Sequence, residues 1–60
     1  MDRRALELCL NKPITLVTED EGSTFAKHGC ILELFDTCLS FSTNGKLLLI
    51  DYSRIKEVRA

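Results

Sequence analysis

Three runs of apolar residues follow one another between positions 29 and 51, and polar breaks separate them. The second break is Asn44-Gly45, whose residues both tolerate the positive φ that a tight two-residue hairpin requires. Leu39–Ser42 and Lys46–Asp51 are therefore predicted to be antiparallel neighbours. The first break is Asp36-Thr37, where a short acidic side chain can hydrogen-bond the backbone just ahead and bend it. Ile31–Phe35 is accordingly expected to pair with the strand that follows.

The first ten residues fit two patterns. Read as a helix, the segment begins at an Asp2 N-cap and places four apolar residues on one face: Ala5, Leu6, Cys9 and Leu10. Read as a strand, it alternates three leucines with other residues: Leu6, Leu8 and Leu10. Because good helix formers dominate and no residue is β-branched, a short helix is the favoured prediction, and Pro13 ends it.

The rest of the chain supplies further strands. Pro13–Thr18 is rich in β-branched residues and predicts the first strand. The acidic segment Glu19–Ser23 is a turn, and Thr24–Phe35 is a long second strand. Gly29 near the middle of that strand suggests a bend or bulge, which lets one strand serve both halves of a curled sheet. The third and fourth strands are Cys38–Ser42 and Lys46–Asp51, and Arg54–Val58 is the last, after a Tyr52-Ser53 turn.

The element order predicts an all-β fold: a small, strongly bent, five-stranded antiparallel barrel with a short N-terminal α-helix. Full or near closure suits a chain too small for a two-layer sandwich, because it removes exposed strand edges. The 60-residue length predicts one domain over residues 1–60. Leu47–Ile50 is apolar on both faces of its strand, so both faces are expected to be covered.

Size makes such a domain marginal alone, since about 60% of the surface of the unfolded chain is buried at this length. Cys9, Cys30 and Cys38 form no disulfide framework and are expected to be reduced. Oligomerisation is therefore the expected source of extra stability. The predicted contact pairs the fourth strand of one copy with the fifth of the next, through five apolar residues: Leu47, Leu48, Leu49, Ile50 and Ile55.

Charge and hydropathy limit the partners. The formal net charge is −1, which counts against strong non-specific binding to nucleic acid without excluding a local basic patch. No apolar run approaches the ~20 residues that span a bilayer, and the N-terminus lacks the apolar segment of a secretory signal, so no membrane partner and a cytoplasmic location are expected.

The order of one helix and five strands resembles the Sm-like family, which includes a bacterial RNA chaperone. The family's first motif has a glycine, alternating apolar residues and an aromatic-aspartate pair, here Gly29 to Phe35-Asp36, continued by Leu39 and Phe41. Its second motif has fixed apolar positions, here Ile50, Ile55 and Val58. This motif carries Arg-Gly in eukaryotic and archaeal members and Lys-His in the bacterial chaperone. Here Asp51-Tyr52 stands in the place of Arg-Gly, and Tyr52-Ser53 stands in the place of Lys-His. The resemblance implies a homo-oligomeric ring of about five to seven copies that holds single-stranded RNA.

The candidate RNA contact is the last turn. An aromatic ring on the rim of a barrel can stack on a base of any sequence, and Arg54 and Lys56 follow Tyr52 at strand spacing, which would put them on its face. Arg59 adds charge, and Arg3-Arg4 adds more if the helix packs nearby. Tyr52, Ser53, Arg54 and Asp36 are the predicted nucleic-acid-binding residues. The alternatives are a half-buried tyrosine beside a solvated basic edge, and a structural or protein-interaction barrel without nucleic acid.

Two other classes of function are weaker. His28 and Cys30 lie two apart on a strand, but a zinc site needs four ligands or three plus water, so no metal or cofactor is expected unless an oligomer interface supplies more ligands. No catalytic triad or paired-carboxylate arrangement is present, so no catalytic residue is assigned and an enzyme is not expected.

Overall fold

The computed structural model describes residues 3–60, and among these it contains one short helix and five antiparallel strands. In chain order the elements are α1 (Arg3–Leu8), β1 (Ile14–Asp20), β2 (Ser23–Leu34), β3 (Cys38–Thr43), β4 (Lys46–Asp51), the 3-10 turn η1 (Tyr52–Arg54) and β5 (Ile55–Arg59). The helix and the β3–β4 hairpin are therefore confirmed. The predicted N-cap, Asp2, lies outside the described residues.

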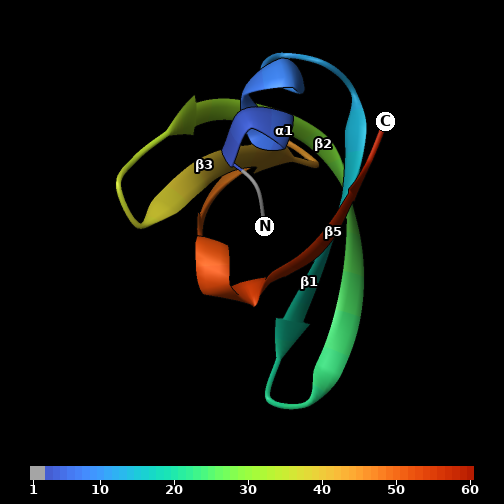
Figure 1. The fold of residues 1–60 in the computed structure, drawn as a ribbon. Coiled ribbons are helices and arrows are strands. Elements are labelled where there is room, and N and C mark those ends of the chain that lie inside the picture. The colour runs from blue at the N-terminus through green and yellow to red at the C-terminus, as the bar shows by residue number, and fades with distance from the viewer. Residues whose placement is uncertain (1–2) are drawn as a thin grey trace.

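The strands form one sheet in the order β4-β3-β2-β1-β5. The two edges, β4 and β5, are joined in sequence by η1 but do not pair with each other, so the sheet is not closed. Figure 1 shows the strands curling around a centre, with α1 at one end and the β1–β2 hairpin reaching out at the other. The sheet thus ends on each side in a strand with one free edge.

β2 connects the two halves of the sheet. Its first part pairs with β1 as far as Gly29, and from Cys30 onward it pairs with β3. A Cβ added at Gly29 would lie 1.9 Å from the backbone oxygen of Ser42, so glycine is required because β3 approaches closely. The prediction that this strand serves both halves of the sheet, changing partner near Gly29, is confirmed, whereas the register shift lies further on, between Ile31 and Glu33.

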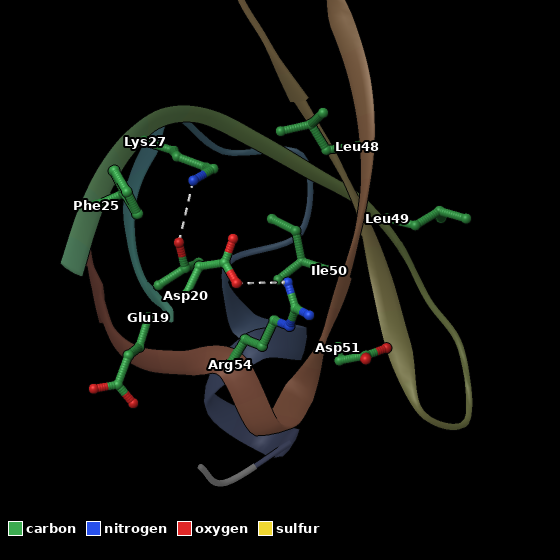
Figure 2. Close-up of a pocket in the computed structure, with 10 residues that line it drawn as sticks. Glu19, Asp20, Phe25, Lys27, Leu48, Leu49, Ile50, Asp51 and Arg54 are labelled. Atoms are coloured by element: carbon green, nitrogen blue, oxygen red, sulfur yellow. Dashed lines mark hydrogen bonds and ion pairs between the residues drawn. The ribbon is translucent and has the colours of Figure 1, made fainter. Parts of the chain in front are cut away.

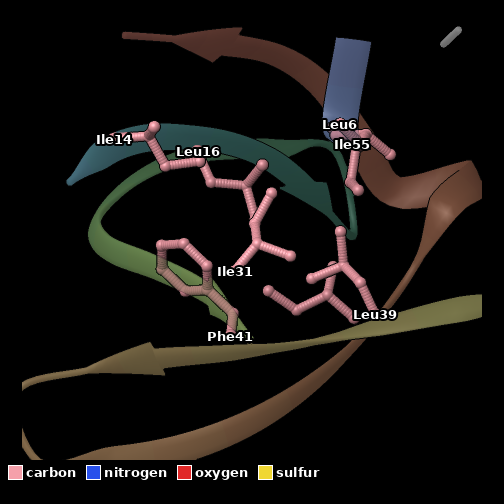
Figure 3. Packing of buried hydrophobic residues seen from close by; sticks show 8 residues of the cluster. Leu6, Ile14, Leu16, Ile31, Leu39, Phe41 and Ile55 are labelled. Carbon is pink, nitrogen blue, oxygen red and sulfur yellow. The ribbon is translucent and has the colours of Figure 1, made fainter. Parts of the chain in front are cut away.

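A small core fills the space between the curled strands. Its largest fully buried side chains are Phe41, Leu6, Leu16, Ile31 and Leu39, with Ile14, Ile50 and Ile55 beside them. Figure 3 shows that these side chains converge from the helix and from strands in both halves of the curled sheet. The alternation within β1 puts every second residue inward, as the period of a strand requires, whereas β3 is buried at three consecutive positions, Leu39, Ser40 and Phe41.

α1 covers one end of this core through a single fully buried residue, Leu6. The predicted apolar helix face is only partly correct, because Ala5 is exposed while Cys9 and Leu10 are half-buried beyond the helix. Leu10 instead forms an isolated parallel bridge with Ile31, and Asn11 donates its N–H to the carbonyl of the same residue. The segment after the helix is therefore tied to β2, where β1 no longer reaches.

The predicted boundaries shift by one or two residues at most strands. β1 continues through Glu19 and Asp20 into what was expected to be the acidic turn, so the turn narrows to Glu21-Gly22. β5 begins at Ile55 rather than at Arg54, because Arg54 belongs to the 3-10 turn. In residues 3–60 no helix is long and apolar enough to cross a bilayer.

Candidate nucleic-acid interface and assembly edges

Two turns that are distant in sequence meet at one end of the sheet. The backbone N–H of Tyr52 donates to the carbonyl of Thr37 at 3.1 Å, and the Tyr52 hydroxyl donates to the carbonyl of Phe35. Phe35 N–H in turn donates to the carbonyl of Cys38 at 2.8 Å, closing the turn around Asp36. The structure therefore brings the predicted site residues Tyr52 and Asp36 into one neighbourhood.

Tyr52 is half-buried and packs against the core, so one side of its ring is already covered. The Arg3 guanidinium lies 5.9 Å from the centroid of the ring, within the range of a cation–π contact. Phe35, by contrast, is 40% exposed. This turn region consequently presents two aromatic residues and one cation. The charge of Arg3 was expected here if the helix packed nearby, whereas Phe35 was not among the predicted contacts.

Arg54 faces a different neighbour. Its Nη1 lies 3.4 Å from Oδ1 of Asp20, at the tip of the β1–β2 hairpin. Lys56 makes the same kind of contact with Glu19, also at 3.4 Å. Because Arg54 lies in a 3-10 turn and not in a strand, it does not follow Tyr52 at strand spacing, and that prediction was wrong. Ser53, also predicted as a contact, is exposed within the same turn.

These ion pairs alter the electrostatics of the predicted basic edge. All four side chains are about half exposed, so water screens them and each pair contributes little to stability. They nevertheless place two carboxylates beside the cations that the site would use for phosphate. The acidic run at 19–21 and the basic residues at 54 and 56 carried this signal in the sequence, but only the pairing of β1 with β5 joins them.

A groove of about 560 Å³ opens between the β1–β2 hairpin and β4. Figure 2 shows Asp20 and Arg54 meeting across it, while Phe25 and Lys27 line the hairpin wall. Lys27 Nζ donates to Thr18 Oγ1 at 3.1 Å and lies 5.2 Å from the Phe25 ring. The groove is thus partly apolar, and ion pairs and hydrogen bonds already engage its cations.

The predicted assembly residues divide into two groups. Ile50 and Ile55 are buried in the core of their own chain, and Leu48 is half-buried against it. Leu47 and Leu49, in contrast, are 63% and 70% exposed. In Figure 2 Leu49 points away from the groove. The outer face of β4 is therefore uncovered in the single chain, and Leu47 and Leu49 carry its apolar surface.

β5 has a different chemical character along its exposed face. Arg59 Nε donates to Oε2 of Glu57 at 2.6 Å, and this hydrogen bond, helped by the charge of Arg59, lowers the pKa of Glu57 below its ordinary value. The same contact raises the pKa of Arg59. Both side chains point away from the core, whereas Ile55 and Val58 pack towards it.

His28 and Cys30 do not gather a metal-ligand set. The Nδ1 atom of His28 lies 2.8 Å from the hydroxyl of Thr15, and its carbonyl accepts a hydrogen bond from Thr43. Residues 3–60 contain no group of three or more His, Cys, Asp or Glu side chains that could hold a metal ion. The three cysteines are free and half-buried.

Comparison of the chain with protein-family models, with curated proteins and with solved structures finds no match in any of the three. The geometry described above is therefore the basis for assigning a function.

Proposed function

We propose that the chain is an Sm-like subunit that assembles through its free strand edges into a homo-oligomeric ring and holds single-stranded RNA at the Tyr52 turn. The observation that carries the proposal is the strand order, in which β4 and β5 each have one free edge and are joined by the turn that bears Tyr52. Pairing of β4 in one copy with β5 in the next would satisfy both edges and close the barrel between subunits.

Such a contact joins two different surfaces, so it is heterologous. A heterologous contact continues from subunit to subunit until the rotation closes it into a ring, whereas a symmetric contact stops at two. In a ring each copy places its Tyr52 turn at the same radius. Several weak sites would then act on one strand together, which raises the apparent affinity without any new contact.

Each site is proposed to hold a base through the aromatic residues of the paired turns. Phe35 supplies the accessible ring, and the hydrogen bond from Tyr52 to the Phe35 carbonyl fixes the two turns relative to each other. Arg3 supplies a positive charge next to the tyrosine. Stacking of a base on an aromatic side chain contributes about 1–3 kcal/mol and tolerates any sequence.

Binding of a fluorescently labelled oligouridine, followed by anisotropy at low salt, tests this site. Replacing Phe35→Ala should weaken binding by on the order of tenfold or more, since one stacking surface per subunit is lost. The matched control is Phe25→Ala, which removes a similarly exposed ring on the β1–β2 hairpin, outside the Phe35 and Tyr52 turns, and should leave binding unchanged. Equal affinities for all three proteins would contradict the assigned site.

The second candidate function is a structural or protein-interaction ring without nucleic acid. It is favoured by one observation, that Arg54 and Lys56 already pair with Asp20 and Glu19. Measurements on the wild-type protein distinguish the two candidate functions. A purified oligomer that shows no raised 260-to-280 absorbance ratio and no oligouridine binding at low salt supports the structural role and rules out the RNA-binding one.

A further inference from the structure

The direction of the backbone groups along β4 can be read from its hairpin. β3 and β4 are joined by Asn44-Gly45, with φ values of 50° and 76°, the two-residue turn whose flanking residues Thr43 and Lys46 exchange both backbone hydrogen bonds. Hydrogen-bonded pairs then alternate along the ladder. Lys46, Leu48 and Ile50 bond to β3, while Leu47, Leu49 and Asp51 direct their N–H and C=O groups to the free edge. The bond from Tyr52 N–H to the Thr37 carbonyl agrees with this phase.

The same reading applies to β5 through the other hairpin. β1 and β2 are joined by Glu21-Gly22, with φ values of 49° and 81°, so Leu16 and Lys27 form a hydrogen-bonded pair. Leu16 therefore directs its backbone groups to β2 and away from its β5 neighbour Val58. Val58 consequently directs its own N–H and C=O to the free edge. Its side chain shares a face with the fully buried Leu16 and packs on the core.

The two edges therefore differ in which side chains accompany the free backbone groups. On β4 the free groups belong to residues whose side chains lie on the outer face, and on β5 they belong to a residue whose side chain lies on the core face. Residues directly opposite each other in an antiparallel pair carry their side chains on the same face. Pairing β4 with the β5 of another copy must then merge the outer face of β4 with the core face of that copy.

From this difference between the free backbone groups of β4 and β5, we propose that Leu47 and Leu49 complete the apolar core of the neighbouring copy, at the free edge of its β5. The partner is a second copy of this chain, and its receiving surface is the core face around Val58 and Ile55. The proposal rests on the strand pairing in the proposed ring and adds which side chains cross it. It also implies that Leu47 and Leu49, which are 63% and 70% exposed in the single chain, become covered when copies assemble.

Two single variants and their mixture test the proposal. Leu49→Lys places a charge on the β4 edge at a residue that is exposed in the single chain, so the subunit should still fold. Val58→Pro removes an N–H that points to the free edge and no bond to β1, and proline is accepted on edge strands. Each variant alone should be monomeric by native mass spectrometry. Mixed in equal amounts they should form a heterodimer, because one retains an intact β5 edge and the other an intact β4 edge.

The control is Leu8→Lys, since Leu8 is 69% exposed on the helix and lies on neither edge. This variant should retain the size of the wild-type assembly. An unchanged assembly of Leu49→Lys would overturn the proposal, as would a symmetric dimer of Val58→Pro alone or a mixture of folded variants that stays monomeric. Should Val58→Pro fail to fold, amide hydrogen exchange of Leu49→Lys tests the proposal instead. Compared with the wild-type assembly, the Val58 amide should lose protection, while the Leu48 amide, which bonds to β3, should keep it. Protection of both amides would contradict the proposal.

These outcomes are separate from those of the proposed function. A wild-type assembly larger than a dimer that binds oligouridine, together with an assembled Leu49→Lys variant, would overturn the leucine contact and leave the RNA-binding ring standing. A wild-type assembly whose edges behave as predicted, but which binds no RNA, would do the reverse.

Discussion

The two halves of the sheet carry different kinds of side chain along their free edges. The half built from β1, β5 and residues 23–29 of β2 carries ion pairs along its edge, including Arg54 with Asp20 and Lys56 with Glu19. The half built from residues 30–34 of β2, β3 and β4 carries exposed leucines at its edge instead. A charged edge discourages unspecific pairing, and an apolar edge invites it. In the proposed ring these two unlike edges pair with each other rather than with copies of themselves.

The junction between the halves should be the most sensitive point. Replacing Gly29→Ala drives a methyl group into the backbone oxygen of Ser42, and this contact cannot be relieved by rotating a side chain. Overpacking costs about 1–3 kcal/mol and occasionally more, and the whole domain is stabilised by on the order of 3–9 kcal/mol. Urea denaturation should therefore show a large fall in the midpoint. Gly45→Asn is the control, because space is open there and asparagine tolerates the positive φ; similar losses for both would contradict the role given to Gly29.

Two leucines on adjacent strands should then separate folding from assembly. Leu39→Ala, at a fully buried position in β3, should lower the free energy of unfolding by about 2–5 kcal/mol. Leu49→Ala, at an exposed position in β4, should leave the subunit folded but remove the dependence of its melting temperature on protein concentration. Calorimetry over a range of concentrations measures both effects. A Leu49→Ala variant whose melting temperature still rises with concentration would show that the apolar edge is not used.

The turn that joins the two edges should have a smaller effect. Tyr52→Phe keeps the ring but removes the hydrogen bond to the Phe35 carbonyl, the contact that fixes η1 against the apolar half. The expected loss is about 1 kcal/mol of unfolding free energy, measured by urea denaturation at a concentration where the assembly state is unchanged. An unaltered midpoint would mean that packing of the ring alone holds the two turns together.

The smallest effect is expected on the charged half. The hydrogen bond from Arg59 lowers the pKa of Glu57, so the contact stabilises the folded chain above the ordinary carboxyl pKa, and the stabilisation is lost as pH falls through the lowered value. Wild type should therefore exceed Glu57→Gln slightly in urea midpoint at neutral pH, and the difference should vanish in acid. A difference that grew on acidification would reverse the assigned sign.

The sequence predicted the elements of this fold better than their relations. Asn44-Gly45 located the β3–β4 hairpin because turn chemistry is local, and the predicted bounds of β4, Lys46–Asp51, are the observed ones. Full or near closure was expected, with an opening beside the fourth and fifth strands, and the structure leaves β4 and β5 unpaired with each other at the two edges of an open sheet. Gly29 was expected to mark a bend or bulge where β2 passes from one half of the sheet to the other. β2 does change partner there, and the close approach of Ser42 from β3 is what requires glycine at this position.

The candidate site was predictable in part for the same reason. Tyr52 and Asp36 follow from turn positions, and the structure places their turns together. Arg3 and Phe35 depend on how the helix and the β2–β3 turn pack, and the pairing of Arg54 with Asp20 depends on β1 lying beside β5. None of these relations leaves a periodic signal in the sequence. Two charge patterns carried a clue: Arg3-Arg4 near the helix start, expected to add charge if the helix packed nearby, and the complementarity between residues 19–21 and 54–56.

The mass of the wild-type protein in solution tests the central claim, that the two unlike edges join copies of the chain, most directly. Multi-angle light scattering at micromolar concentration should report a monodisperse homo-oligomer larger than a dimer, with about five to seven copies expected for a closed heterologous ring. A well-folded, monodisperse species of 6.8 kDa, the mass of a single chain, would contradict the account.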